Sequence, residues 1–243
     1  VAPPIKYNNH KIAIIGAGPA GISMSIILAL KGFKVTLIDG QDKIGGVLRY
    51  GIPEFRLPRY ILGLYETLLK KLGVKFKPNT FVGSNLNLDD MFMDGYSAVF
   101  VAVGTSKPNR LGLLGETLGH VHYAIDYLKT PDAYDLGKNI VVIGVGNVAC
   151  DAARMAIRHH NDANIVLINN RREEDVTASS KEIKHVLEEG ISFKHLLSTL
   201  RIDDDNVICC KVSPIENEDG TVTFEEEMKE IVKIPADSVI IAI

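Results

Sequence analysis

Residues 11–21 have the sequence KIAIIGAGPAG, a short β-branched run that leads into three glycines spaced Gly-x-Gly-x-x-Gly. The apolar segment 22–30 follows this turn and predicts a buried helix that ends at Gly32. A second β-rich run, residues 34–38, then ends at Asp39. The order of strand, glycine turn, helix and strand predicts a parallel sheet with right-handed crossovers.

The three glycines of this turn have separate tasks. Gly16 permits the tight turn, Gly18 lets the backbone approach a pyrophosphate, and Gly21 lets helix and strand pack closely. The helix start directs free N–H groups and the positive end of its dipole at the phosphates. Asp39 offers a carboxylate to ribose hydroxyls at the end of the next strand. We interpret this context as a dinucleotide site; the alternative is a glycine turn kept for packing alone.

The same pattern occurs again in the middle of the chain. A strand over residues 140–143 leads into the turn GVGNVA at Gly144–Ala149, and a helix over 151–159 and a strand over 164–168 follow. Ala149 stands in the place of the third glycine, a variant common where NADP binds. We therefore expect a second dinucleotide-binding unit.

No acid follows the strand 164–168 at the ribose position. Asn169 and Asn170 stand there instead, followed by Arg171 and Arg172. Guanidinium groups bind a 2′-phosphate in bidentate fashion, whereas a carboxylate would repel it. The pattern favours NADP over NAD, with NADH still possible. The alternative is a solvated charge run in which both arginines pair with the acids at 173–175.

Two such sites in one chain predict an oxidoreductase in which hydride passes between NADPH and FAD. Hydride transfer between the two cofactors requires no acid, base or nucleophile, so we predict no catalytic side chain. The three cysteines, Cys150, Cys209 and Cys210, form no CxxC pair. We therefore expect reduced thiols in a cytoplasmic protein, with no iron–sulfur cluster and no metal site in this chain.

The composition narrows the range of partners. The chain has 243 residues, of which 46% are hydrophobic and 23% are charged, and its net charge is −3. This charge predicts no basic face for nucleic acid. No apolar run reaches the roughly 18 residues of a membrane-spanning helix, so we expect no membrane partner.

The remaining pattern completes a prediction of two doubly wound α/β domains. We expect an FAD-binding domain over residues 1–107, to which residues 236–243 return, and an NAD(P)H-binding domain over 108–235 inserted between them. The run 238–243 is so apolar that we expect it inside a sheet of which the C-terminal part is missing from this sequence. Other predicted elements are helices at 58–72 and 181–189, strands at 74–77 and 98–103, a link at 107–119, and antiparallel strands at 206–212 and 221–234.

One stretch carries a far more specific signal than the glycine turns. Residues 45–58 have the sequence GGVLRYGIPEFRLP, which resembles the GGxLRYGIPEFRLPK motif of the glutamate synthase small (beta) subunit family. That family also covers the related region of dihydropyrimidine dehydrogenase and NADPH–ferredoxin reductases of this type. Residues 111–121, 144–151 and 188–193 are similar to its LGxPGExLxGV, GGGNVAMD and EEGVEF motifs.

The resemblance implies roles for residues of the first half of the chain. The FAD pyrophosphate would lie on Gly16, Ala17, Gly18, Pro19 and Ala20, and its adenosine ribose on Asp39. The remaining FAD contacts would come from Gly46, Val47 and Arg56 at the flavin, from the backbone of Val82 at the adenine, and from Gly104.

The resemblance also implies a nicotinamide dinucleotide site in the second half. Its phosphates would lie on Gly144, Val145, Gly146, Asn147 and Val148. Asn170, Arg171 and Arg172 stand where the family has YRR, so that Asn170 replaces a tyrosine. Two other departures are expected, since neither the family's N-terminal cysteine-rich domain nor its final segment with the flavin-binding GD motif occurs in this sequence.

The family likeness also implies a partner. It would be an iron–sulfur electron-transfer protein or a glutamate synthase large subunit. A stand-alone NAD(P)H–ferredoxin reductase and a non-catalytic nucleotide-binding subunit remain as alternatives at this point.

Overall fold

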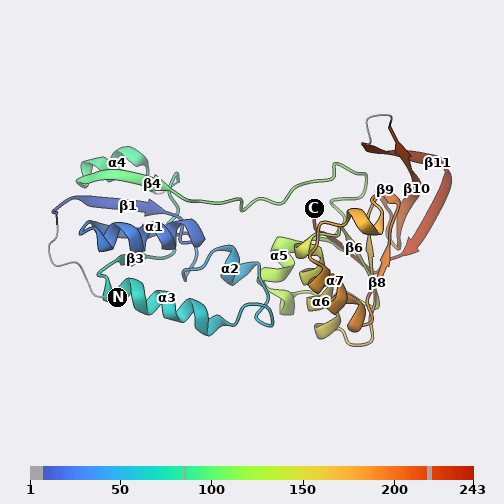
Figure 1. Ribbon diagram of the computed structural model, residues 1–243, viewed down its shortest axis with the longest axis horizontal. Coiled ribbons are helices and arrows are strands. Elements are labelled where there is room, and N and C mark those ends of the chain that lie inside the picture. Colours follow the sequence, from blue (N-terminus) through green and yellow to red (C-terminus); the bar gives the residue numbers. More distant parts are fainter. Residues whose placement is uncertain (1–7, 85, 218–220) are drawn as a thin grey trace. The chain divides into compact units, whose positions relative to one another are not determined.

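The computed structural model describes residues 8–84, 86–217 and 221–243, and the chain divides into two compact units, Val1–Ser106 and Lys107–Ile243 (Figure 1). This boundary falls one residue before the expected one. Residues 1–7, the start of the predicted FAD-binding domain, lie outside the described residues. The predicted α/β class with parallel sheets is confirmed. No helix in the described part of the chain has the length and apolarity needed to cross a membrane.

The first unit is built on a four-stranded sheet with the order β3-β2-β1-β4, in which all neighbours are parallel. Its elements are β1 (Lys11–Ile15), α1 (Pro19–Leu30), β2 (Lys34–Ile38), α2 (Val47–Tyr50), α3 (Arg59–Lys71), β3 (Lys75–Lys77), α4 (Leu88–Met93) and β4 (Tyr96–Val101).

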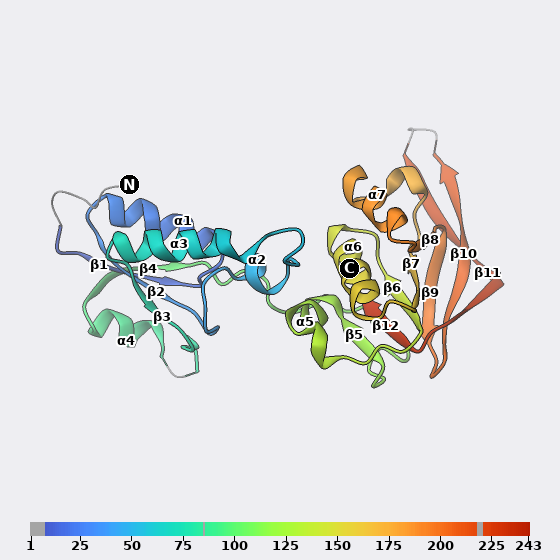
Figure 2. The same cartoon turned by 90° about the horizontal axis from the view of Figure 1, so that it is seen from below.

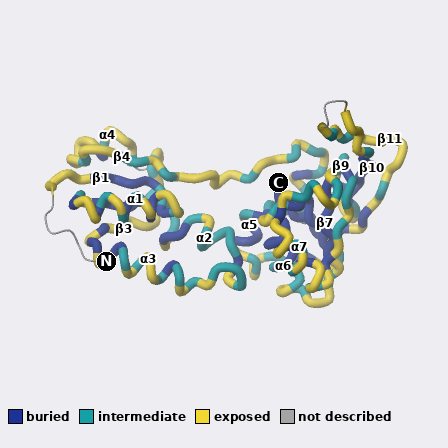
Figure 3. The backbone as a smooth tube through the Cα atoms, viewed as in Figure 1, coloured by how far each residue is buried: buried dark blue, intermediate teal, exposed yellow. Residues whose placement is uncertain are grey.

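Helices cover both faces of this sheet. Ile12 and Ile14 of β1 pack in one apolar cluster with residues of α1 and α3, whereas Ala13 and Ile15 pack with Met91 of α4 on the opposite face. Figure 2 shows α1 and α3 on one side of the strands and α4 on the other. Successive side chains of a strand point to opposite faces, and both faces are covered here, so β1 is buried at every position after its first (Figure 3).

The second unit contains a five-stranded parallel sheet, β5-β12-β6-β7-β8, and a three-stranded antiparallel sheet, β11-β10-β9. Its elements are β5 (Val121–Tyr123), α5 (Ala124–Lys129), η1 (Pro131–Ala133), β6 (Asn139–Ile143), α6 (Asn147–His159), β7 (Asn164–Ile168), η2 (Glu173–Asp175), α7 (Ser180–Glu188), β8 (Ser192–Lys194), β9 (Leu197–Ile202), β10 (Asn206–Glu216), β11 (Val222–Pro235) and β12 (Ser238–Ile241).

The parallel sheet lies between two layers. On one face, Ile140 and Val142 of β6 pack against residues of α5, α6 and α7. On the other face, Val141 and Ile143 pack against buried residues of β9, β10 and β11, among them Cys209. The antiparallel hairpin predicted for this region thus serves as the second cover of the sheet (Figure 2).

The prediction that residues 236–243 return to the first unit is wrong. β12 lies between β5 and β6, where Val239 pairs with Val121 on one side and with Val141 on the other. All four residues of β12 are buried, because helices cover one face of this sheet and antiparallel strands cover the other. Among the described residues, β12 therefore belongs to the sheet of the second unit.

Candidate dinucleotide-binding sites

The first glycine turn joins β1 to α1. The Gly16 N–H donates to the Ile38 carbonyl over 2.7 Å. Gly16 has a φ of 103°, and a Cβ atom there would lie 2.2 Å from the Ala102 carbonyl oxygen, so only glycine fits. α1 begins at Pro19 with Gly18 as its N-cap and without a side-chain cap. The N–H groups of the first turn are therefore left for a ligand such as phosphate.

Asp39 lies directly on this turn. Its Oδ2 accepts a hydrogen bond from the Ala17 N–H over 2.6 Å, and its Oδ1 accepts one from the Gln41 N–H over 2.7 Å. Ala17 is fully buried, whereas Pro19 and Ala20 are exposed at the helix start. The structure thus brings together the predicted pyrophosphate and ribose residues within one hydrogen-bonded group.

The stretch 45–58 lies against the same turn. The Gly45 N–H donates to the Ala17 carbonyl over 2.8 Å, and a Cβ on Gly46 would lie 2.8 Å from the Gly18 Cα. Val47, the first residue of α2, is 56% exposed although it is apolar. Gly46 and Val47 therefore lie beside the first glycine turn, and their contact with the flavin stays a prediction.

Side chains of the stretch 45–58 fix its conformation. Arg49 donates from Nε to the Ile44 carbonyl over 2.6 Å and from Nη2 to the Glu66 carboxylate over 2.7 Å. The Tyr50 hydroxyl donates to Asp42 over 2.5 Å. Burial, with this hydrogen bond, raises the pKa of Tyr50 to about 12. These bonds tie α2 to α3 and to the loop after β2.

The other three predicted FAD residues occupy different parts of the first unit. Arg56 is half-buried in a turn of the stretch 45–58, where its N–H donates to the Pro53 carbonyl over 3.0 Å. The Val82 side chain packs against an apolar cluster that contains Met91, and Val82 forms an isolated β-bridge with Leu86. Gly104 is exposed beyond the carboxyl end of β4.

The second glycine turn repeats this arrangement between β6 and α6. The Gly144 N–H donates to the Ile168 carbonyl over 3.0 Å, as Gly16 does to Ile38. α6 begins at Asn147, its N-cap is Gly146, and Val148 in its first turn is 50% exposed. A second set of helix N–H groups is thus offered to phosphates.

The loop 176–179 closes one side of this second turn. The Val145 carbonyl accepts a hydrogen bond from the Ala178 N–H over 3.2 Å. Asn147 accepts one from the Ser179 N–H at its Oδ1 over 3.1 Å. The role implied for Asn147 was a phosphate contact, and the structure adds that its side chain holds this loop.

A cavity of about 450 Å³ opens at the carboxyl ends of β6 and β7. In parallel α/β sheets this edge is where ligands bind. Gly144, Val145, Gly146, Asn170 and Arg171 are predicted residues that line it. The other lining residues are Leu111, Leu113, Ile143, Ile168, Asn169, Thr177, Leu197, Ser198, Thr199, Ala242 and Ile243.

The two arginines after β7 have different surroundings. Arg171 lines the cavity. Arg172 does not; its Nε lies 2.7 Å from Asp175 Oδ2 and 3.1 Å from Glu174 Oε1. The hydrogen bond to Asp175 raises the pKa of Arg172 and lowers that of the Asp175 carboxyl. The charge-run alternative therefore holds for Arg172, and only Arg171 faces the cavity.

Sequence reasoning missed part of the cavity wall. Leu111 and Leu113 belong to a segment interpreted as a link, and Thr177 belongs to the loop after η2. Thr199 comes from β9, which crosses from the neighbouring sheet. The family-like motif over residues 111–121 was the one available signal for the two leucines, and no pattern marked the threonines.

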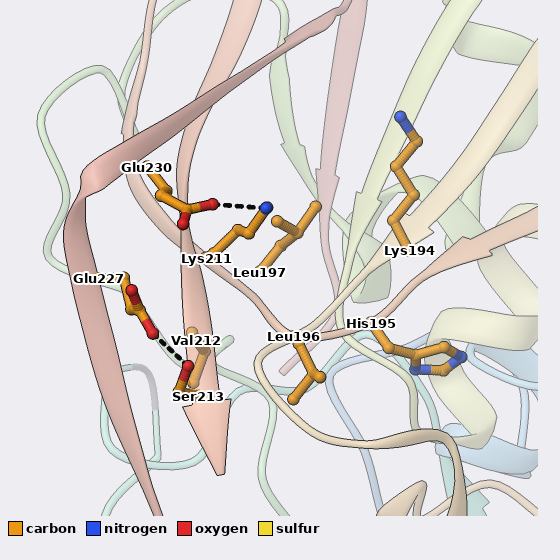
Figure 4. A pocket seen from close by; sticks show the side chains of 9 residues that line it. All are labelled: Lys194, His195, Leu196, Leu197, Lys211, Val212, Ser213, Glu227 and Glu230. Carbon is orange, nitrogen blue, oxygen red and sulfur yellow. Dashed lines mark hydrogen bonds and ion pairs between the residues drawn. The ribbon is translucent and has the colours of Figure 1, made fainter.

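A second cavity, of about 580 Å³, lies over β10 and β11 (Figure 4). Four of its polar residues already pair with one another, because Lys211 contacts Glu230 over 2.5 Å and Ser213 donates to Glu227. Leu197 lines both cavities, but none of the residues predicted to bind a nucleotide lines the second one.

The described residues also bear on metal and thiol chemistry. Among them no group of three or more His, Cys, Asp or Glu side chains could hold a metal ion. Cys150, Cys209 and Cys210 are buried and form no disulfide. Burial raises the pKa of Cys209 to about 11, which keeps it a neutral thiol.

Comparison with known proteins agrees with this architecture. A family model described as pyridine nucleotide-disulphide oxidoreductase matches residues 10–243. The chain is 33% identical over 259 aligned residues to the glutamate synthase [NADPH] small chain of Escherichia coli, an alignment that covers 98% of this chain and 54% of that protein. It is 37% identical over 197 residues to the NADP(+)-dependent formate dehydrogenase subunit beta of Moorella thermoacetica, covering 79% of this chain and 28% of that protein.

A solved structure shares the fold. Mycobacterium tuberculosis FprA in complex with NADPH matches with a TM-score of 0.80 at 18% identity, covering 96% of this chain and 70% of that one. The chain spans about half or less of the length of the two relatives described above.

Proposed function

The chain belongs to the pyridine nucleotide-disulphide oxidoreductase family, and on this basis we propose that it takes hydride from NADPH onto FAD and passes electrons to an iron–sulfur partner. One observation carries the proposal: two separate units each present a glycine turn, a polar side chain at the end of the next strand and an exposed helix start. One such site binds one dinucleotide, so two sites serve a reaction between two of them.

The first unit fits FAD. A Cβ on Gly46 would fill the space beside Gly18, so the backbone there forms a cradle that side chains leave open. In our proposal Gly16–Ala20 hold the pyrophosphate, Asp39 the ribose, and the backbone of Val82 the adenine. The contacts on the flavin side come from Gly46, Val47 and Arg56. Gly104 is a further contact with FAD. FAD, when bound, would accept hydride and release electrons to a one-electron acceptor.

The second unit fits NADPH. Residues 144–148 offer phosphate-binding N–H groups, and the cavity wall carries Asn170 and Arg171 at the end of β7. The Arg171 guanidinium would bind the 2′-phosphate that distinguishes NADPH from NADH. Arg172 stays with Asp175 and supports the loop, so we assign it no direct contact.

The proposed acceptor is an iron–sulfur protein or the large subunit of a glutamate synthase. Two relatives are a glutamate synthase small chain and a formate dehydrogenase subunit beta, which supports a partner of that kind. The chain alone should reduce an artificial acceptor such as ferricyanide with NADPH. It should form no glutamate; glutamate formation by the isolated chain would contradict this assignment.

A visible absorption spectrum tests the proposal. The purified chain is incubated with FAD, freed of unbound FAD by gel filtration and titrated with NADPH without oxygen. We expect a flavin band that remains after gel filtration and bleaches with NADPH. A protein that stays colourless, and that binds neither NADP⁺ nor NAD⁺ in a calorimeter, overturns the proposal.

A further inference from the structure

The two units contain the same tight turn, here called the corner, directly after the second strand of each glycine-turn motif. Asp39 follows β2 and Asn169 follows β7. In each case the side-chain Oδ1 accepts a hydrogen bond from the N–H two residues later, Gln41 over 2.7 Å and Arg171 over 2.8 Å. The residue that begins the nucleotide-facing loop is therefore held in the same way in both units.

The facing segment also corresponds between the units. The Asn79 N–H donates to the Gln41 carbonyl and the Leu196 N–H donates to the Arg171 carbonyl, both over 3.1 Å. Both residues are left-handed, with φ values of 51° and 56°. Asparagine tolerates this conformation well, whereas leucine does so at a cost. The second unit thus keeps a strained corner whose amide holds the Arg171 backbone.

The corners differ in the second polar atom of the strand-end side chain. In the first unit, Asp39 Oδ2 accepts from the Ala17 N–H of the glycine turn. In the second, the Oδ1 of Asn169 is occupied by the Arg171 N–H, so its Nδ2 is the group that lies 2.9 Å from His195 Nδ1. An amide nitrogen can only donate, so the ring nitrogen must accept.

His195 is well placed to hold this bond. Its ring is half-buried and stacks on Phe193, with ring centroids 5.6 Å apart and planes 9° apart. His195 lines the second cavity together with Lys211 and Ser213, and Figure 4 shows its ring turned away from those two side chains. The stacking on Phe193 holds the His195 ring in place, and the ring in turn holds the Asn169 carboxamide.

This inference rests on the proposed function. We propose that His195 is a positioning residue for coenzyme selection. It locks the Asn169 carboxamide so that Oδ1 retains the Arg171 N–H, and this keeps Arg171 at the cavity. The same lock presents a neutral amide, only 8% exposed, where the first unit presents a carboxylate. A 2′-phosphate thus meets a guanidinium and no like charge.

Calorimetric binding of NADP⁺, NAD⁺ and adenosine 2′,5′-bisphosphate to the full chain tests this role. His195→Ala removes the acceptor and should weaken NADP⁺ and the bisphosphate roughly tenfold, while NAD⁺ changes less than about threefold. His195→Leu retains an apolar contact with Phe193 and should behave like His195→Ala. His195→Asn places an oxygen near the Nδ1 position and should restore NADP⁺ affinity to within about threefold.

The outcomes separate this role from the proposed function. If His195→Ala and His195→Leu weaken the affinity for NADP⁺ and for NAD⁺ equally, or weaken neither, the positioning role is overturned. NADP⁺ binding by the wild-type chain would in that case still uphold the proposed function. Failure of His195→Asn to restore NADP⁺ binding in a folded protein, checked by circular dichroism, also overturns it. A wild-type chain that binds neither coenzyme overturns both.

Discussion

The Tyr123 hydroxyl donates a hydrogen bond to the Glu116 carboxylate over 3.0 Å, inside the segment that joins the link motif to β5. The same carboxylate accepts the N–H groups of Leu111, Gly112 and Leu113 over 2.9, 2.7 and 3.3 Å. Glu116 is 7% exposed. Leu111 and Leu113 line the cavity at the carboxyl ends of β6 and β7, so the Glu116 carboxylate shapes one wall of that cavity.

Glu116 should make stability depend on pH. Burial alone would raise its pKa, but the hydrogen bonds, led by that from Leu111, outweigh it and hold the pKa below its usual value. A carboxyl whose pKa is lower in the folded state stabilises above its unfolded pKa and loses that contribution as pH falls through the folded one. The free energy of unfolding should therefore fall below about pH 4.5.

Glu116→Gln isolates this contribution. It should lower the free energy of unfolding by about 1–3 kcal/mol at pH 7. As the pH is lowered further, the free energy of unfolding of this variant should fall less steeply than that of the wild type. Urea unfolding followed by circular dichroism at pH 7 and in steps down to about pH 3 measures both. Tyr123→Phe is the matched control, because it removes one bond of four and should cost about 1 kcal/mol. An unchanged acid slope in Glu116→Gln would refute the explanation.

Gly46→Ala should abolish FAD retention. Its φ of 52° costs an alanine about 1–2 kcal/mol, and the new Cβ would displace the Gly18 backbone, which lies 2.8 Å away. The readout is the flavin absorbance that remains after gel filtration.

Gly63→Ala is the control for that substitution. Gly63 lies in α3 with no atom within 4 Å of a new Cβ, so alanine there should add up to about 1 kcal/mol of stability and leave FAD retention unchanged. Equal FAD retention in the two variants would show that the Gly46–Gly18 approach does not shape the site.

Arg154→Met should be strongly destabilising. Arg154 lies under α7 with its side chain 7% exposed, and it contacts Glu182 and Glu189 over 3.0 Å each. Removing it leaves Glu182 buried without this cation, which costs about 3–5 kcal/mol. Arg158→Met, at a 45% exposed side chain bound to the same Glu189, should cost less than about 1 kcal/mol. Thermal unfolding compares the two, and similar losses would contradict the burial argument.

Arg171→Ala and Arg172→Ala should differ in coenzyme binding. Arg171→Ala should weaken NADP⁺ by roughly tenfold or more, whereas NAD⁺ stays within about threefold. Arg172→Ala should change NADP⁺ by less than about threefold, because that guanidinium is held by Asp175 and Glu174. Calorimetry with both coenzymes decides, and the reverse ranking would assign the 2′-phosphate to Arg172.

Local patterns predicted the strands well and their partners less well. The strands at 11–15, 34–38 and 164–168 occur at the predicted residues, because each is an apolar run bounded by a glycine or by polar residues. The helices begin earlier than predicted, at Pro19 and Asn147, because the glycine turn supplies their first residues. The sheet that contains β12 could not be deduced, since a strand buried on both faces has the same composition in either sheet.

The candidate site likewise contains residues that local patterns predict and residues that they do not. The glycine turns, Asp39 and the arginines follow from local spacing, and the structure places Arg171 at the cavity. The partners of these residues come from distant segments; Thr199 lies on β9 and His195 follows β8. No local periodicity encodes that proximity, so it emerges only from the packing of one sheet on the other.

β11 has a consequence for how separate copies of the protein behave. It is 14 residues long, forms the outer edge of the antiparallel sheet and is exposed over most of its length. Such an edge offers backbone groups to any other extended chain. Here the glutamates at 225–227 and 230 and the lysines at 229 and 233 stand along it. These charges oppose edge-to-edge joining of two molecules, so the strand that covers the core also limits aggregation.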